Sequence, residues 1–140
     1  MNERQPKDYP HNVDNLVITC MDFRFQKAIR EQLQEKYQVD IESSDRIAYP
    51  GASKAIADGT LIPTIQLSHQ LHDIKNVYVI DHTDCGGFGG LAAHENDERK
   101  EIASHMDSMT RAQEAIRMVL PQLVVTSFVV NLEGEAIHLT

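Results

Sequence analysis

Residues 76–90 read NVYVIDHTDCGGFGG, an apolar run followed at once by a histidine, a cysteine and four glycines. The apolar, partly β-branched run at 76–81 predicts a short buried strand that ends abruptly. The glycines behind it let the backbone turn tightly and approach a bound group closely. This junction of strand and loop permits three interpretations: a glycine loop that cradles an anion, a cysteine nucleophile at a helix start, or half of a metal site.

On either side of this stretch, apolar runs alternate with helical patterns. The apolar runs predict strands at 15–20, 46–49, 76–81, 123–132 and 136–139. Helical periodicity or apolar content between them predicts helices at 25–37, 61–73 and 97–120. This order predicts an α/β fold: a doubly wound, mostly parallel sheet with helices on both faces, closed by a C-terminal antiparallel hairpin strand.

The length of 140 residues suits one domain. We expect a polar N-terminal arm over 1–13 and a single folded domain over 14–140. In the predicted helix over 97–120, an apolar stripe is expected to pack in the core or a dimer interface; it comprises Ile102, Met106, Met109, Gln113, Ile116 and Leu120.

Composition and charge exclude several classes of protein. Thirteen basic against 21 acidic residues give a net charge of −8, which argues against a nucleic-acid partner. No apolar run approaches the roughly 20 residues that cross a bilayer, so no membrane association is expected. The polar start MNERQPKDYP has no signal-peptide pattern, and a cytoplasmic location is expected. Two cysteines in such a chain indicate a metal site or catalysis more than a disulfide framework.

Three side chains that can bind a metal or act in catalysis lie at or just beyond the ends of predicted strands. Cys20 ends the first predicted strand, and His82 and Cys85 follow the third. In open α/β sheets, ligands bind at the carboxyl ends of the strands where the strand order reverses. If the first and third strands are neighbours, as in the flavodoxin-like order, the three side chains converge. Two thiolates and an imidazole suit zinc, and three protein ligands leave the open position of a catalytic site.

A charged pair accompanies the first cysteine in CMDFR, residues 20–24. Arg24 lies two residues beyond Asp22, so it can keep the carboxylate ionised and fix its direction. An aspartate placed in this way can orient a hydroxide on zinc or ligate the metal itself.

The paired motifs CMDFR and HTDCG resemble those of the β-class carbonic anhydrases, and the likeness extends over residues 14–140. The resemblance implies one zinc ion per chain, held by Cys20, His82 and Cys85, with Asp22 and Arg24 as a catalytic dyad. It also implies that Asp22 ligates zinc in a closed state. The implied reaction is the reversible hydration of CO2 to bicarbonate by a zinc-bound hydroxide.

The family is dimeric, so the resemblance also implies a homodimer or a higher oligomer with active sites near the subunit interface. The helix at 61–73 agrees, because its apolar residues cover more than one face: Leu61, Ile62, Ile65, Leu67 and Leu71. The segment RIAYPGAS (46–53) loosely resembles a family segment near the pocket. Substrate contacts are therefore expected at Gly51 and Ala52, and at Gly86 behind the second cysteine.

The chain departs from the family pattern at Phe23, where a small residue is common, and at Asp81, where glycine is common. Because of Phe23 and the altered segment RIAYPGAS, a zinc hydrolase acting on another small linear molecule such as CS2 is a second hypothesis. A metal-free cysteine enzyme built on Cys85 and a non-catalytic zinc module are two more. Nothing in the sequence selects His94 or His105 as a proton relay.

Overall fold

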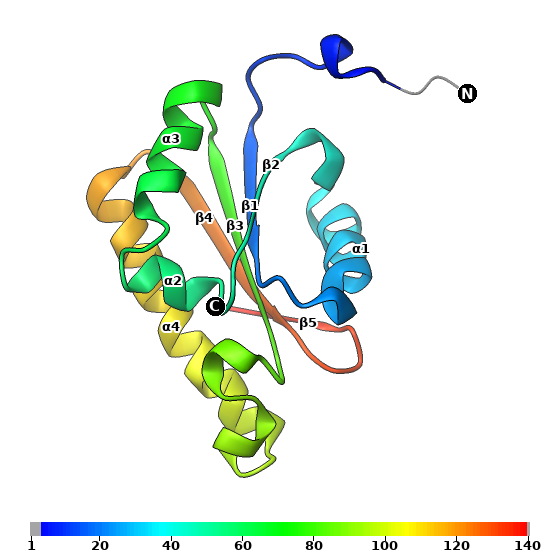
Figure 1. The fold of residues 1–140 in the computed structure, drawn as a ribbon, viewed down its shortest axis with the longest axis vertical. Helices are drawn as coiled ribbons and strands as arrows, with labels where there is room; N and C mark the ends of the chain where they lie inside the picture. Colours follow the sequence, from blue (N-terminus) through cyan, green and yellow to red (C-terminus); the bar gives the residue numbers. More distant parts are fainter. Residues whose placement is uncertain (1–3, 140) are drawn as a thin grey trace.

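A computed structural model describes residues 4–139 and shows a single sheet between helices (Figure 1). Its strands are β1 (Asn15–Thr19), β2 (Asp45–Ala48), β3 (Asn76–His82), β4 (Val124–Val130) and β5 (Ala136–His138). The strand order is β2-β1-β3-β4-β5, with β5 antiparallel to β4 and all other pairs parallel. The predicted fold class is confirmed, including the adjacency of β1 and β3 on which convergence of the site depends.

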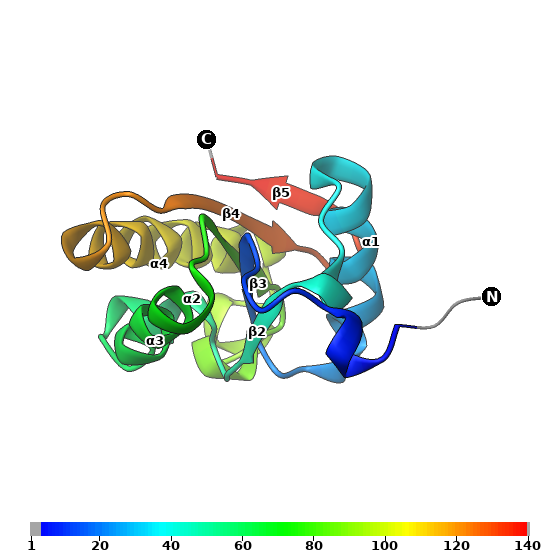
Figure 2. The same ribbon diagram turned by 90° about the horizontal axis from the view of Figure 1, so that it is seen from above.

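Helices cover both faces of this sheet. They are α1 (Gln26–Tyr37), α2 (Ser53–Ala57), α3 (Ile62–His72) and α4 (Glu98–Val119). Figure 2 shows α1 on one side of the sheet and the other three helices on the opposite side. The sequence did not predict α2, which has only five residues and follows directly on the Pro50-Gly51 turn.

The alternation of side chains along the strands divides the core into two layers. On β1, Leu16 and Ile18 pack in the cluster under α2, α3 and α4, whereas Val17 packs in the cluster under α1. The helix predicted at 25–37 is confirmed as α1, and its residues Ile29 and Leu33 are both fully buried there. The sheet is therefore covered on both sides, as a parallel sheet requires.

The face that α4 buries agrees with the predicted stripe only in part. Its buried residues are Glu101, His105, Ser108, Met109, Ala112 and Ile116. Met109, Ile116 and Leu120 of the predicted stripe are buried, whereas Ile102, Met106 and Gln113 are only partly buried. Apolar periodicity misplaced the first half of this face because that half of the helix buries polar side chains that find partners in the fold.

Part of the predicted arm lies outside the described residues, which begin at Arg4. A short 3₁₀ turn forms at Pro6–Asp8, and Val13 N–H then donates to the His72 carbonyl, 3.1 Å away. The division at residue 13 stays a prediction. Within residues 4–139 we find no helix that combines the length and apolarity needed to span a bilayer.

Candidate metal centre

Cys20, His82 and Cys85 meet at the carboxyl ends of β1 and β3. Their ligand atoms all lie within 4.8 Å of one another, and all three residues are buried. Cys20 directly follows β1, His82 ends β3, and Cys85 opens the 3₁₀ turn Gly86–Phe88. The parallel register of β1 with β3, with Thr19 opposite Ile80, places these residues side by side. The predicted convergence is therefore present.

The His82 ring is held in one orientation and one tautomer. Its Nδ1 lies 2.7 Å from the Thr83 carbonyl oxygen and so donates its proton there. The Phe25 ring stacks on it at 4.2 Å between centroids. Nε2 is then left with its lone pair exposed to the two sulfurs, and it is buried without a hydrogen-bond partner. Burying a nitrogen without a hydrogen-bond partner costs free energy, and a metal ion bound to Nε2 would remove that cost.

A hydrogen bond joins the sulfurs of Cys20 and Cys85. Their separation is 3.9 Å, and the Cys85 thiol donates toward Cys20. This hydrogen bond is the largest cause that lowers the pKa of Cys20, and it is also the largest cause that raises the pKa of Cys85, ahead of burial and the Cys20 charge. Two thiolates about 2.3 Å from one tetrahedral zinc would stand about 3.8 Å apart. The donor set and the observed sulfur separation therefore fit zinc.

The Asp22–Arg24 pair forms beside this cluster. Arg24 donates from Nη2 to Asp22 Oδ2 over 2.7 Å and from Nε to both carboxylate oxygens over 3.1 and 3.2 Å. These hydrogen bonds from Arg24 are the main reason that the pKa of Asp22 is lowered to about 2. Asp22 Oδ2 also lies 4.0 Å from His82 Nε2. The carboxylate therefore borders the Cys/His/Cys cluster, but Arg24 holds both of its oxygens.

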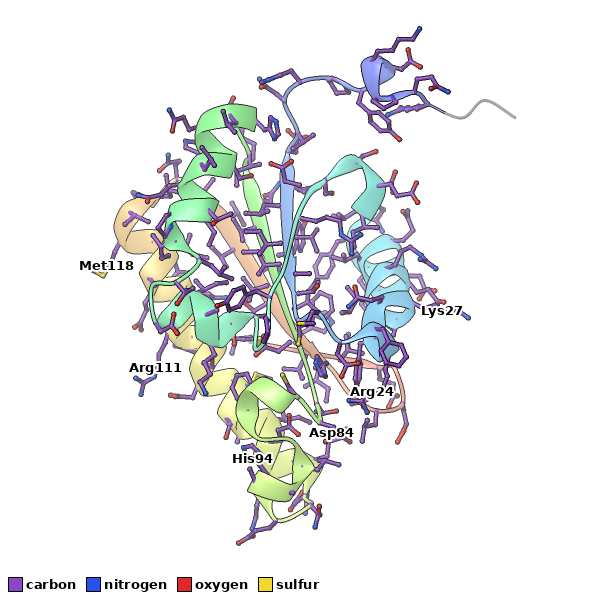
Figure 3. The ribbon with its side chains drawn as sticks, viewed as in Figure 1. Arg24, Lys27, Asp84, His94, Arg111 and Met118 are labelled. Carbon is purple, nitrogen blue, oxygen red and sulfur yellow. The ribbon has the colours of Figure 1, made fainter. Side chains whose placement is uncertain are left out.

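Asp84 is a third member of this charged group, and sequence reasoning missed it. Arg24 donates from Nη1 to Asp84 Oδ2 and from Nη2 to the Asp84 carbonyl, both over 3.2 Å (Figure 3). Asp84 has a positive φ of 51°, and its Oδ1 accepts from the Leu91 amide over 3.1 Å. The loop between His82 and Cys85 thus holds Arg24, which in turn holds Asp22. Its place between His82 and Cys85 was the only signal in the sequence.

A pocket of about 430 Å³ opens beside the cluster, lined by Cys20, Met21, Asp22, Phe23, Arg24, Pro50, Gly86 and Gly87. Of the three predicted substrate contacts, only Gly86 lines it. Gly51 and Ala52 are buried and lie outside the lining. Phe23 has 85% of its surface exposed and Met21 65%, so the rim of the pocket is apolar.

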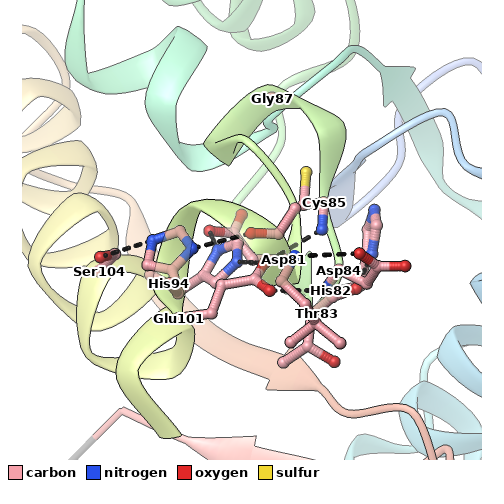
Figure 4. Close-up of polar contacts among 12 residues, drawn as sticks. Asp81, His82, Thr83, Asp84, Cys85, Gly87, His94, Glu101 and Ser104 are labelled. Atoms are coloured by element: carbon pink, nitrogen blue, oxygen red, sulfur yellow. Dashed lines mark hydrogen bonds and ion pairs between the residues drawn. The ribbon is translucent and has the colours of Figure 1, made fainter. Parts of the chain in front are cut away.

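Three buried ionisable residues lie behind the loop that carries Asp84 and Cys85: Asp81, Glu101 and His105, none more than 1% exposed. Burial lowers the pKa of His105, but the hydrogen bonds and charges of Asp81 and Glu101 raise it, and the net shift is upward. Figure 4 shows Glu101 reaching from α4 to the loop that carries Asp84 and Cys85. The sequence signal for this group was the i,i+4 spacing of Glu101 and His105, which apolar periodicity ignores.

The other histidines are not part of a second metal cluster. His72 Nδ1 lies 2.7 Å from Asp45 Oδ2, and His69 contacts the Ile74 carbonyl and Gln122. His94 contacts the Gly90 carbonyl and Ser104 Oγ (Figure 4). Among residues 4–139, Cys20, His82 and Cys85 are the only group with metal-binding geometry.

Comparison with known proteins places this chain among related sequences. The model of a family described as "Putative carbonic anhydrase" matches residues 11–139. An uncharacterized protein of Rickettsia conorii is 32% identical over 134 residues, covering 89% of this chain and 70% of that protein. An uncharacterized protein of Rickettsia bellii is 31% identical over 134 residues, covering 89% and 80%.

Solved structures show the same fold at low sequence identity. β-Carbonic anhydrase isoform I of Trichomonas vaginalis superposes with a TM-score of 0.63 and 11% identity, covering 94% of this chain and 85% of that one. The β-carbonic anhydrase CafD of Aspergillus fumigatus gives a TM-score of 0.63 and 12% identity, covering 95% and 89%. At these identities the likeness demonstrates the fold alone.

Proposed function

Because this chain belongs to the family described as "Putative carbonic anhydrase", we propose that it catalyses the reversible hydration of CO2 to bicarbonate with the aid of zinc. Cys20, His82 and Cys85 would hold one zinc ion per chain. The observation that carries the proposal is the buried Nε2 of His82, which faces two sulfur atoms and has no other partner. Bound zinc would supply Lewis acidity that lowers the pKa of a coordinated water to about 7.

The protein's own groups position the reactants. The Thr83 carbonyl holds the Nδ1 proton of His82 and so keeps Nε2 available as a ligand. Asp22, kept ionised by Arg24, would accept the hydrogen bond of the attacking water and orient its lone pair toward carbon. Arg24 in turn donates to Asp84, so the direction of the Asp22 carboxylate is set by both the loop after β1 and the loop after β3.

The pocket suits a small apolar substrate. Met21, Phe23 and Pro50 would bind CO2 against their apolar surfaces, and the lining glycine Gly86 leaves room beside the metal. When Arg24 releases its hold, Asp22 would be free to ligate the metal and close the site. The closed state and the substrate contacts, including the expected ones at Gly51 and Ala52, belong to this proposal.

The test combines metal quantification with stopped-flow CO2 hydration on one sample, after zinc reconstitution under reducing conditions. We expect close to one zinc per chain and a hydration rate that disappears when zinc is stripped. Cys85→Ala should lose most of the metal and the activity together. A chain that binds no zinc would contradict the metal site. A zinc-loaded chain without hydration activity would leave a zinc site and contradict the reaction.

The apolar rim formed by Met21 and Phe23 favours a second candidate, hydrolysis of CS2, which is also linear and small. The same zinc-loaded sample separates the two reactions. CS2 turnover without CO2 hydration would select this candidate. Inactivity toward both substrates would select a non-catalytic zinc module.

A homodimer is part of the proposal as well. Leu61 and Ile65 of the 61–73 segment are buried, whereas Leu67 and Leu71 are about half exposed, at 49% and 50%. The segment thus presents apolar surface on a face that the single chain does not cover. Light scattering at micromolar concentration should give twice the mass of 15.8 kDa. A monomer would contradict the dimer without affecting the metal site.

A further inference from the structure

The strongest feature outside the site is the buried group Asp81–His105–Glu101, which lies behind the metal-binding loop. His105 contacts Asp81 Oδ2 through Nδ1 over 2.7 Å and Glu101 Oε2 through Nε2 over 2.9 Å. The imidazole therefore bridges two carboxylates in the interior. Burying two carboxylates is unfavourable, and apolar side chains in their place would stabilise the fold at least equally. The hydrogen bonds that the two carboxylates accept indicate a role other than stability.

Glu101 binds the backbone of the loop that carries the third ligand. Its Oε1 accepts from the Asp84 amide over 2.7 Å and its Oε2 from the Cys85 amide over 3.0 Å. These two donors come from consecutive residues of a turn in which Asp84 has a positive φ of 51°. A single carboxylate on α4 therefore fixes the orientation of the peptide that carries the Cys85 side chain.

The cluster lies between two walls, the loop at 83–87 and the segment at 50–53. Asp81 binds the second wall as Glu101 binds the first. Its Oδ1 accepts from the Ser53 amide over 3.0 Å and its Oδ2 from the Ser53 hydroxyl over 2.6 Å. Ser53 begins α2 and follows Gly51 and Ala52, which both have positive φ, of 77° and 34°. The segment that passes beside Cys20 is thus held by the residue that directly precedes His82.

The two walls are in direct backbone contact. A Cβ built on Gly87 would lie 2.7 Å from the Gly51 Cα and 2.8 Å from its nitrogen. A small displacement of either wall would therefore separate the sulfurs of Cys20 and Cys85, which now stand 3.9 Å apart. The distance between the two sulfurs therefore depends on Glu101 and Asp81, which hold the two walls from behind the cluster.

We propose that Glu101, His105 and Asp81 are positioning residues that set the geometry of the metal site by holding its two walls at a fixed separation. The inference rests on the proposed zinc site and assigns roles to residues outside the predicted ligand set and dyad. Glu101 acts on Cys85 through the loop amides. His105 orients Glu101, and Asp81 transmits the same constraint to the Ser53 wall.

The first experiment measures zinc affinity of Glu101→Gln by competition with a chromophoric chelator. Glutamine keeps the shape of the side chain but has only one acceptor oxygen. The donors are the Asp84 amide, the Cys85 amide and His105 Nε2, so one of the two loop amides would face an NH2 group. We expect affinity to fall about 10- to 100-fold, with a smaller loss for His105→Gln. The cobalt-substituted variant should show altered sulfur-to-cobalt charge-transfer bands.

Two controls separate positioning from general stability. Glu114→Gln makes the same chemical change on an exposed part of α4 and should bind zinc as the wild type does. Ile65→Ala truncates a fully buried residue of α3 and should lower the melting temperature without changing zinc affinity or the cobalt spectrum. Wild-type affinity and spectrum in folded Glu101→Gln and His105→Gln would overturn the proposal.

Hydrogen exchange of the wild-type protein decides the matter even if those variants do not fold. The Asp84 and Cys85 amide protons should exchange slowly, because a buried carboxylate accepts both. Exchange at the rate of an unstructured peptide would overturn the proposal. A wild-type chain that binds no zinc would contradict the proposed function, whereas zinc binding unchanged by Glu101→Gln would contradict only this inference.

Discussion

Arg24 binds Asp22 and Asp84 at once, so one guanidinium connects the loop after β1 with the loop after β3. Its Nη2 lies 2.7 Å from Asp22 Oδ2, and its Nη1 lies 3.2 Å from Asp84 Oδ2. The Asp22 side chain also accepts from the Arg24 amide over 3.0 Å. The direction of the Asp22 carboxylate, which borders the Cys/His/Cys cluster, is therefore set by both loops.

Arg24→Ala should lower CO2 hydration about 100-fold while zinc stays bound, because the freed Asp22 loses the direction that catalysis needs. Asp22→Asn should cause a loss of similar size, since the amide is a poor acceptor for the attacking water. The two residues act as a unit, so the double variant should be little worse than Arg24→Ala. Stopped-flow assays on metal-quantified samples measure this. Full activity in either single variant would refute the assigned roles.

Asp84→Asn tests the third member of the group. Asparagine tolerates the positive φ and keeps an acceptor for the Leu91 amide, but it removes the charge that faces Arg24. Activity should fall by less than in Arg24→Ala, with zinc content unchanged. A loss as large as that of Arg24→Ala would show that Asp84 acts on the reaction by another route.

Much of the fold and the convergence of Cys20, His82 and Cys85 followed from the sequence because the signals are local. The apolar runs that end at Cys20 and just before His82 mark the carboxyl ends of two strands, and the alternating order of elements makes those strands parallel. The polar face of α4 had no such signal. Glu101 and His105 are buried only because Asp81 and two loop amides, far away in sequence, supply their partners.

The backbone conformation of residues 50–53 could not be predicted from the sequence for a similar reason. The conformation of Ala52, with φ of 34° and ψ of −90°, is imposed by tertiary contacts of Ser53 with Asp81. The substrate contacts expected at Gly51 and Ala52 came from a loose likeness of sequence. The structure buries both residues and Pro50 lines the pocket beside them, so the contacts at Gly51 and Ala52 stay a prediction.

Two adjacent glycines provide a matched test of the packing of the walls. Gly87→Ala places a Cβ against the Gly51 backbone, at 2.7 Å from its Cα, and should lower the free energy of unfolding by about 1–3 kcal/mol. Gly86→Ala meets no atom within 4 Å and should change it by less than about 0.5 kcal/mol. Denaturant unfolding of both variants measures the difference. Equal stabilities would contradict the close approach of the walls.

Zinc affinity should decrease as the pH falls, because cysteine and histidine ligands release protons when they bind metal. Between pH 8 and pH 6 the affinity should fall by at least about tenfold per pH unit, as expected when one or more protons compete for the ligands. Chelator competition at several pH values measures the slope. Cys85→Ala removes one thiol and should show a shallower slope, and a wild-type affinity independent of pH would contradict thiolate ligation.

X-ray absorption at the zinc edge tests the central claim most directly, because it reports the atoms bound to the metal. The reconstituted protein should show two sulfur neighbours at about 2.3 Å and lighter neighbours at about 2.0–2.1 Å. Cys20→Ala and Cys85→Ala should each lose one sulfur from that shell in whatever zinc they retain. A shell of nitrogen and oxygen alone, or no bound zinc, would contradict a site built from Cys20, His82 and Cys85.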